Sequence, residues 1–417
     1  MTSGEAATDQ HPAVAGDPGA GLAPQDPIDP APAGVPIPPE PARSASDPGT
    51  TAPADGTESA PVDPPSPAAR GLRRRPRPAP GWWARSPRPW LRHPAAVLCG
   101  ALLAAATPST AARLLGGDDV FPLPALAALA PMAGVLAVVA CVPAAFARSR
   151  WLAGLGALLV ALHLFWAVPD LVGTDNRLPL SAPGGDLRVL ELNTFEGQAD
   201  SGAVVRAVHE HRVDLLVLAE TTPAFETALD DAGVRTELPY LWDLPRAAPD
   251  VMLRSRWPIT DCRAVWLSIS AIPEARIRVP GGAEVSVLGV HVVSPKARAV
   301  GEWQSDLTKL TQLGHSVHGP TVFVGDFNAG TVHAPFRRLL GTGLVDAASV
   351  RSARPDPWWW APLWTWPADL SVPPFVRIDH VLVTPSSIAV RSVRTVAVPG
   401  TDHLGVLASL RVARATG

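Results

Sequence analysis

The sequence Val322-Phe-Val-Gly-Asp-Phe-Asn-Ala329 contains the residues that decide the fold. Its first three residues are β-branched or aromatic, which predicts a buried strand that ends at Gly325. Because residues two apart on an extended chain point the same way, Asp326 and Asn328 are expected to project together past the edge of a sheet. A carboxylate beside a carboxamide suits a hard metal ion, a water and a phosphate oxygen. The same residue types also favour turns, so this stretch alone leaves a simple turn open.

Length and composition limit the number of domains and the classes of protein that the chain can belong to. A chain of 417 residues has room for two or three domains. Its formal net charge of −3 provides no overall electrostatic signature for nucleic acid. Three cysteines, two of them in apolar runs, do not predict a disulfide framework.

The region 1–92 is expected to be a disordered, Pro/Ala-rich tail. It contains few aromatic residues and no sustained periodicity, so it cannot bury enough apolar surface to offset its ordering entropy. From Arg70 onward, arginines alternate with tryptophans. Directly ahead of an apolar run, this mixture predicts a basic juxtamembrane segment on the cytoplasmic side of a membrane.

Three apolar segments follow, and we expect three transmembrane helices within 93–172. They run from Pro94 to Leu115, from Leu123 to Ala147 and from Trp151 to Val172, each close to the ~20 residues that cross a bilayer. A buried hairpin of a soluble domain is the alternative interpretation. The arginine-rich flank before the first segment, and the arginines between the second and third, place the N-terminus in the cytoplasm by the positive-inside rule. The rest of the chain would then lie outside the plasma membrane.

After a linker at 173–186, residues 187–417 have the pattern of one α/β domain with a substantial core. Strands are predicted at Leu187–Leu192, Leu215–Ala219, Val285–Val293, Thr321–Val324, Ile378–Val383 and Val406–Arg411. Helical patterns cover Ala203–His211 and Ala297–His318.

Polar residues recur where these strands end. Each has an ordinary structural explanation, such as a turn cap, a surface position, a core histidine or a helix N-cap. In chain order they are Asn193, Glu220, His291, Asp326, Asn328, Asp379, Asp402 and His403.

This ordered set, with Gly-Asp-Phe-Asn and a terminal Asp-His, resembles the endonuclease/exonuclease/phosphatase superfamily. That superfamily has the fold of the DNase I-like enzymes, neutral sphingomyelinases and inositol polyphosphate phosphatases, and the resemblance covers about Leu187 to Arg411. It implies a four-layer α/β sandwich in which two packed mixed β-sheets are flanked by helices.

The resemblance also implies roles for the residues. Asn193, Glu220 and Asp402 would be ligands of, or lie near, Mg²⁺, with Mn²⁺ as an alternative. Asp326 and Asn328 would orient the attacking water and a phosphate oxygen. His291 would stabilise charge on the phosphoryl oxygens and so bind the substrate together with Asn328. Asp379 and His403 would form a dyad that transfers protons.

Some positions depart from the family pattern. Ala219 stands where Gln is frequent before the metal-binding Glu, Thr401 replaces a frequent Ser, and Arg254 occupies a commonly apolar position. The tract from Pro357 to Pro367 holds five tryptophans and would be either a packed loop or a rim that enters the bilayer interface.

The sequence therefore predicts a membrane-anchored, extracytoplasmic, metal-dependent phosphoester hydrolase that acts on a phospholipid or a lipid-linked cell-envelope intermediate. Three spans before such a domain resemble bacterial membrane proteins associated with vancomycin/teicoplanin resistance. The alternatives are an extracytoplasmic nuclease and a non-catalytic binding or sensor protein on the same fold. The sequence indicates no protein partner.

Overall fold

The computed structural model describes residues 89–242, 250–353 and 363–414. Most of the predicted tail and part of the tryptophan-rich tract lie outside these ranges. All described residues belong to one compact unit of the chain, Pro78–Gly417.

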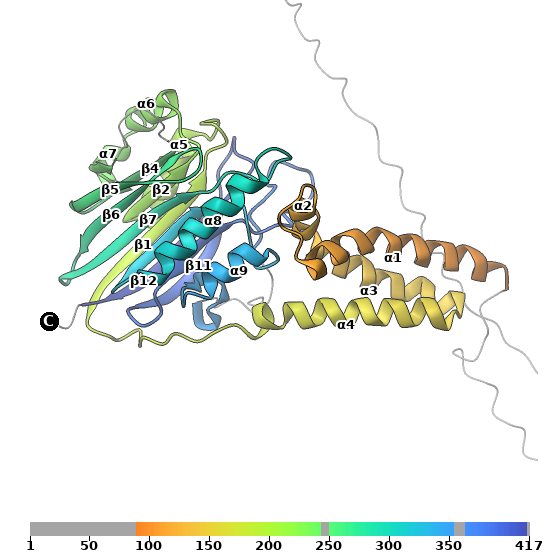
Figure 1. The fold of residues 1–417 in the computed structure, drawn as a ribbon. Helices are drawn as coiled ribbons and strands as arrows, with labels where there is room; N and C mark the ends of the chain where they lie inside the picture. The colour runs from red at the N-terminus through yellow and green to blue at the C-terminus, as the bar shows by residue number, and fades with distance from the viewer. Residues whose placement is uncertain (1–88, 243–249, 354–362, 415–417) are drawn as a thin grey trace, which may run out of the picture. The chain divides into compact units, whose positions relative to one another are not determined.

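Three long apolar helices precede the α/β domain (Figure 1). They are α1 (Arg92–Leu115), α3 (Ala130–Ala147) and α4 (Arg150–Val172), and each is long and apolar enough to cross a membrane. A short 3-10 helix, η2 (Pro89–Leu91), leads into α1.

The second apolar segment differs from the prediction of one helix over Leu123–Ala147. It forms a short helix, α2 (Leu123–Ala128), and then α3, with Leu129 between them. Pro131 lies in the first turn of α3, where its missing N–H costs nothing, but it could not have continued α2. The candidate span is therefore shorter than expected.

Small residues allow the three helices to pack closely. Cys99 and Leu103 of α1 lie against Ala137 and Ala140 of α3, and all four side chains are buried. Alanine at such contacts lets helix backbones approach each other, as is common in membrane bundles. Large apolar side chains such as Phe165 remain exposed on the outside of the bundle.

The α/β domain contains two six-stranded mixed sheets. The first sheet has the order β11-β12-β1-β2-β4-β3, formed by β11 (Ile388–Ala397), β12 (Leu404–Ala413), β1 (Gly184–Asn193), β2 (Leu215–Ala219), β4 (Val251–Ser255) and β3 (Tyr240–Trp242). The second sheet has the order β5-β6-β7-β8-β10-β9, formed by β5 (Ile259–Trp266), β6 (Ala271–Val279), β7 (Ala283–His291), β8 (Thr321–Asp326), β10 (Asp379–Val383) and β9 (Val345–Asp346).

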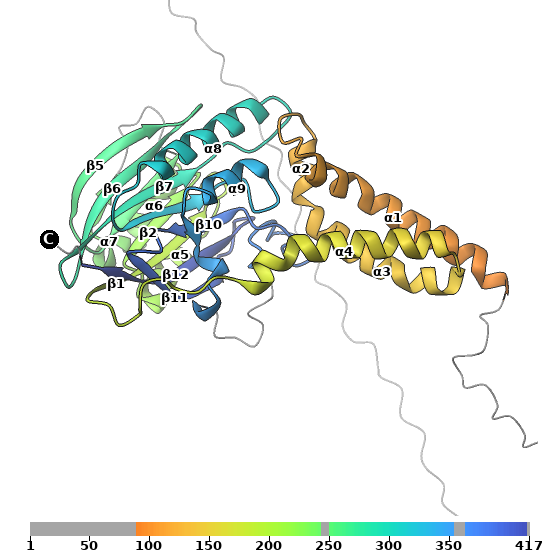
Figure 2. The same ribbon diagram turned by 60° about the horizontal axis from the view of Figure 1, so that its bottom comes forward.

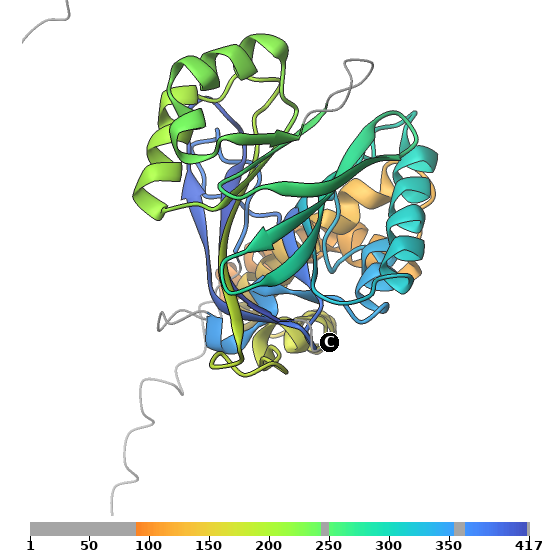
Figure 3. The ribbon, with the colours of Figure 1, turned by 90° about the vertical axis from the view of Figure 1, so that its left-hand side faces the viewer.

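Helices cover the outer faces of both sheets, which gives four layers (Figures 2 and 3). The green helices of Figure 3 belong to the first sheet's side and are α5 (Ser201–His211), α6 (Pro223–Asp231) and α7 (Val234–Glu237). The cyan and blue helices on the other side are α8 (Val300–His315) and α9 (Ala334–Leu340), and two short 3-10 turns, η3 (Ala347–Ser349) and η4 (Arg351–Ala353), follow β9. The predicted sandwich is confirmed.

Alternation along the strands separates two apolar layers. In β1, Val189 packs into the core between the sheets, whereas Leu190 and Leu192 pack beneath the helices of the first sheet. Glu191 and Asn193 have the same parity as Val189, so they point between the two sheets. This parity brings polar side chains of β1 towards the second sheet.

Parallel pairing places the ends of the central strands at one edge. In the first sheet β1 is parallel to β2, and in the second sheet β7 is parallel to β8. The carboxyl ends of parallel neighbours meet at the same edge. Antiparallel β10 starts there, because Asp379 is paired with Asp326. We call this the catalytic edge of the domain.

The backbone of Gly325 tolerates no side chain. Its φ is 148°, and a Cβ atom there would lie 1.8 Å from the carbonyl oxygen of Val290 on the neighbouring strand. Any other residue would therefore push β7 and β8 apart beside the catalytic edge.

We expect Gly325→Ala to lower the melting temperature sharply or to prevent folding, because the clash is with backbone and cannot relax by rotamer change. Gly301→Ala in α8 is the matched control, since nothing lies within 4 Å of a Cβ atom there. Alanine in a helix is favoured over glycine by about 1 kcal/mol, so the control should be neutral or slightly stabilising. Thermal unfolding of the two full-length variants, followed by tryptophan fluorescence, tests this, and equal melting temperatures would contradict it.

Candidate active site

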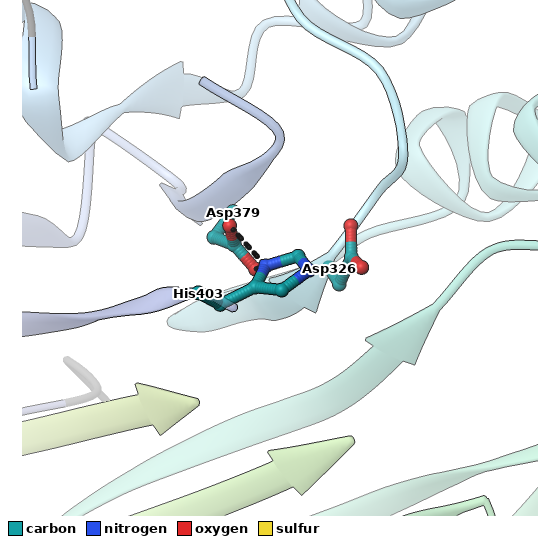
Figure 4. A group of neighbouring side chains, drawn as sticks. All are labelled: Asp326, Asp379 and His403. Atoms are coloured by element: carbon teal, nitrogen blue, oxygen red, sulfur yellow. Dashed lines mark hydrogen bonds and ion pairs between the residues drawn. The ribbon is translucent and has the colours of Figure 1, made fainter. Parts of the chain in front are cut away.

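Asp326, Asp379 and His403 form a buried cluster between the two sheets (Figure 4). The imidazole Nδ1 of His403 lies 2.9 Å and 3.1 Å from the two carboxylate oxygens of Asp379. Figure 4 shows the ring between Asp379 and Asp326. This geometry makes Nδ1 the donor to Asp379 and leaves Nε2 directed at the site, as in the predicted dyad.

The cluster shifts the pKa values of its members. Burial alone would lower the pKa of His403, but the charge and hydrogen bond of Asp379, with Asp326 and Asp402 nearby, raise it to about 10. Burial raises the pKa of Asp326 to about 6, with the charge of Asp379 acting in the same direction and His403 and His291 opposing it. At neutral pH the cluster therefore combines an imidazolium with carboxylates that attract it.

Asn193, at the end of β1, joins the two sheets at this edge. Its amide Nδ2 donates to Glu220 at 3.0 Å and to Asp326 at 3.1 Å. The side-chain hydroxyl of Thr194 fixes the turn after β2 by donating to the carbonyl oxygens of Ala219 and Glu220. The two predicted metal ligands Asn193 and Glu220 thus lie in contact, with Asp326 beside them.

Thr401 also connects the cluster. Its hydroxyl donates to the carbonyl oxygen of Asn193 at 2.7 Å and accepts from the backbone N–H of His403 at 3.1 Å. A serine would supply the same hydroxyl, so this departure from the family pattern keeps the contact.

Several non-glycine residues at this edge have left-handed backbone conformations. They are Phe195, Glu196, Glu220 and Asn328, with φ between 46° and 54°. Such conformations are uncommon outside glycine and cluster at functional sites, where the surrounding structure holds them in place. Four at one edge support its identification as the working part of the molecule.

His291, at the end of β7, lies across the site from His403. Its Nδ1 is 2.5 Å from a carboxylate oxygen of Asp250, and its Nε2 is 3.5 Å from Glu220. Burial lowers the pKa of His291, but Asp250 and the other carboxylates raise it to about 9. The sequence interpretation missed Asp250. The sequence provided only a weak indication of its role, because Asp250 is a single acid one residue before a strand and 41 positions from its partner His291.

Asn328 is held by several hydrogen bonds. Its Nδ2 donates to the carbonyl oxygen of Val292 at 2.8 Å, and its backbone N–H donates to Asp326 at 2.7 Å. The indole N–H of buried Trp303 donates to its carbonyl oxygen at 3.0 Å. The turn after β8 is therefore a rigid part of the site and not a free loop.

Asp402 lies at the mouth of the cluster. One carboxylate oxygen accepts from the indole N–H of Trp366 at 2.9 Å. The other is buried, lies 3.8 Å from Nε2 of His403 and has no hydrogen-bond partner among the described residues. A buried carboxylate oxygen without a partner is costly unless a ligand or ion satisfies it.

Glu191 is a second feature that the sequence interpretation missed. It is buried in β1, and its carboxyl group faces Asp379 of the second sheet. Burial, followed by the negative charges of Asp379 and Asp326, raises its pKa well above the ordinary value. Its parity with Asn193 was visible in the sequence, but only the second sheet reveals the acids that it faces.

The residues present fit a hard divalent cation. Ligand atoms of Asp326, Asp379 and His403 all lie within 4.8 Å of one another. Glu220 lies beside this group, linked to Asp326 through the amide nitrogen of Asn193, and Asp402 adds the buried oxygen without a partner. Carboxylate oxygens in excess over nitrogen are the donors that Mg²⁺ and similar ions prefer.

Comparison with known proteins identifies the family of the chain. The family model described as "Endonuclease/Exonuclease/phosphatase family" matches residues 190–403, just over half of the chain. The protein belongs to the endonuclease/exonuclease/phosphatase family, a class of phosphatase- and nuclease-type hydrolases whose members generally depend on divalent metals. No curated protein matches the chain.

Several solved structures are similar to part of this chain. An endonuclease/exonuclease/phosphatase from Beutenbergia cavernae is 19% identical, covers 55% of this chain and 72% of its own, and has a TM-score of 0.41. A Bacteroides thetaiotaomicron mannosyl-6-phosphatase is 19% identical (54% and 99% covered, TM-score 0.42). D. rerio TDP2 with a single-strand DNA product is 14% identical (54% and 99% covered, TM-score 0.43).

We expect Glu191→Gln to stabilise the protein at pH 8 and to leave it unchanged near pH 4. The unfolded chain loses the Glu191 proton near pH 4.5, whereas the raised pKa lets the folded chain hold it to a higher pH, so folding becomes less favourable as pH rises above 4.5. Glutamine removes this cost, which is about 1.4 kcal/mol per unit of raised pKa. Melting temperatures in EDTA across this pH range measure it.

The control is Glu210→Gln on the exposed face of α5, which should shift the melting temperature equally little at both pH values. A Glu191→Gln variant that is less stable than wild type at pH 8 would show that the buried carboxyl group is ionised.

Proposed function

We propose that the protein is a membrane-anchored phosphoester hydrolase that uses Mg²⁺ and acts on the outer side of the plasma membrane. Its substrate in this proposal is a phospholipid or a lipid-linked cell-envelope intermediate. The observation that carries the proposal is the buried group of Asp326, Asp379 and His403 at the catalytic edge, in a chain with three helices able to span a membrane.

Each residue has a role that follows from its surroundings. Asp379 fixes the tautomer and orientation of His403, and the raised pKa of His403 keeps the ring cationic. The cationic ring can stabilise negative charge on the substrate or donate a proton to the leaving oxygen. His291, held by Asp250, offers a second cation to the phosphoryl oxygens.

Asp326 suits the task of orienting a water molecule and accepting its proton. Its pKa of about 6 leaves it ionised at neutral pH yet more basic than an ordinary aspartate. Asn328 is fixed beside it and can direct a phosphate oxygen. Asn193, Glu220 and Asp402 would hold the metal ion, which when bound neutralises charge on the phosphoryl group.

We expect the full-length protein in detergent–lipid micelles to release phosphate or head group from a lipid substrate with Mg²⁺ and not with EDTA. His403→Ala and Asp326→Ala should each lower kcat by about 10²–10⁴-fold, since proton transfer contributes that much. Parallel assays would use a phospholipid, an undecaprenyl-type pyrophosphate and single-stranded DNA.

His318→Ala, the same change at an exposed position after α8, is the control and should keep wild-type activity. Cleavage of DNA alone would identify a nuclease. Full activity in Asp326→Ala would overturn the site assignment. No activity of the wild-type protein on any of the three substrates would favour a binding or sensor protein.

A further inference from the structure

The loop between α1 and α2 and the first turn of α2 contact the α/β domain close to the catalytic edge. The carboxylate of Asp118 accepts from the backbone N–H of Ala334 at 2.7 Å. The carbonyl oxygen of Pro124 lies 3.0 Å from Nε2 of buried His333, whose Nδ1 accepts from the N–H of Gly330. Because Nδ1 accepts, Nε2 carries the proton and donates to Pro124. These partners lie two to six residues after Asn328.

The end of α4 reaches the same region. The carboxylate of Asp170, in the last turn of α4, accepts from the hydroxyl of Thr331 at 3.4 Å and lies 3.9 Å from the guanidinium of Arg377. Arg377 is two residues before Asp379. The α1–α2 region and the end of α4 therefore both contact segments of the domain that adjoin the active site.

After α4 the chain runs to the far end of the first sheet, and strand β1 then brings it back to the catalytic edge. Asn176 pairs with Val390 near the start of β11, and Gly184 is paired with Ala413 at the far end of the first sheet. From Gly184, strand β1 runs back to Asn193, about 30 Å at the usual rise per residue. The active site is therefore at the end of the domain that lies next to the bundle.

Exposed apolar side chains gather at this same end. Among the described residues of the α/β domain, seven large apolar side chains are largely exposed, and five of them lie around the catalytic edge. We call these five the apolar rim. They are Phe195 (39% exposed), Trp266 (63%), Ile269 (63%), Leu370 (52%) and Val372 (52%).

Register places each part of the apolar rim. Phe195 lies two residues after Asn193 and donates its backbone N–H to that side chain. The β5–β6 hairpin carrying Trp266 and Ile269 continues β6 beyond the pair Glu274–Leu288, towards the level of His291. Leu370 and Val372 follow a backbone hydrogen bond from Ala368 to Asp402.

We propose that the apolar rim rests in the head-group layer of the bilayer that holds the chain's own helices. The active site then receives a phosphoester whose apolar part remains in the membrane. The lipid surface is the occupant that the geometry favours, because the spans and the site meet at one end of the domain. Exposed apolar and tryptophan side chains are stable at that interface. The substrate class in this inference rests on the proposed function, whereas the placement of the rim does not.

The placement can be measured without any enzymatic activity. Full-length protein lacking Cys141 and Cys262 would carry a fluorophore at Ile269→Cys or Val372→Cys and be reconstituted into vesicles that contain head-group nitroxide lipids. We expect strong quenching at both positions. Glu284→Cys, at the start of β7 and so at the opposite end of that strand from His291, is the control and should not be quenched. Equal quenching at Val372 and Glu284, or none at either rim position, would overturn the proposal.

A second experiment compares turnover of a bilayer phosphodiester with that of its short-chain, water-soluble analogue. Ile269→Asp and Val372→Asp should each lower the ratio of bilayer to soluble turnover, and the double variant should lower it about tenfold, because charge is disfavoured at the membrane interface. Leu241→Asp on β3, equally apolar and exposed but away from the edge, should leave the ratio unchanged. An unchanged ratio in the double variant would overturn the inference.

Failure of the proposed function gives a different result. In that case wild type would hydrolyse neither substrate, while the quenching pattern would still report where the rim lies.

Discussion

The structure depends on balancing negative charge between two packed sheets. Asp326 and Asp379 are paired across β8 and β10, and Glu191 faces them from β1. Carboxylates so close together repel one another in a poorly solvated interior, and an unpaired buried charge costs several kcal/mol. Two imidazolium groups compensate for this charge, and the raised pKa of Glu191 favours its neutral form beside the two aspartates. The site is thus a region where stability is given up for chemistry, as the left-handed residues beside it also indicate.

Parallel strand pairs explain why so much of the site could be predicted. A polar residue that ends a buried apolar run is visible in one dimension, and Asn193, Glu220, His291 and Asp326 all have this form. Once the family order was recognised, Asp379 and His403 followed, and the structure joins them by a hydrogen bond. The central strands were predicted from their apolar runs, whereas the four-layer fold was implied by the family resemblance.

Several other elements of the structure could not be predicted from the sequence. Strand β5 is almost entirely exposed, so its sequence lacks the apolar alternation that reveals a half-buried strand. Helices α7 and α9 are too short for helical periodicity. Asp250 acquires its meaning only from His291, which tertiary structure brings to it. By contrast, the break at Leu129 was signalled by Pro131, because proline lacks the N–H that a helix continuing from α2 would need at that position.

The pairing of β1 with β12 has a consequence for the order of events during synthesis. Strand β1 emerges first among the strands yet lies inside its sheet, and the Thr401–Asn193 hydrogen bond spans 208 positions. A growing chain can form its apolar helices and pair β1 with β2, but β1 stays an open edge until β12 arrives. Closing so long a loop is slow, and the unpaired edge is prone to aggregation meanwhile. Asp379, Asp402 and His403 also arrive late, so the buried cluster between the two sheets cannot form until the chain is nearly complete.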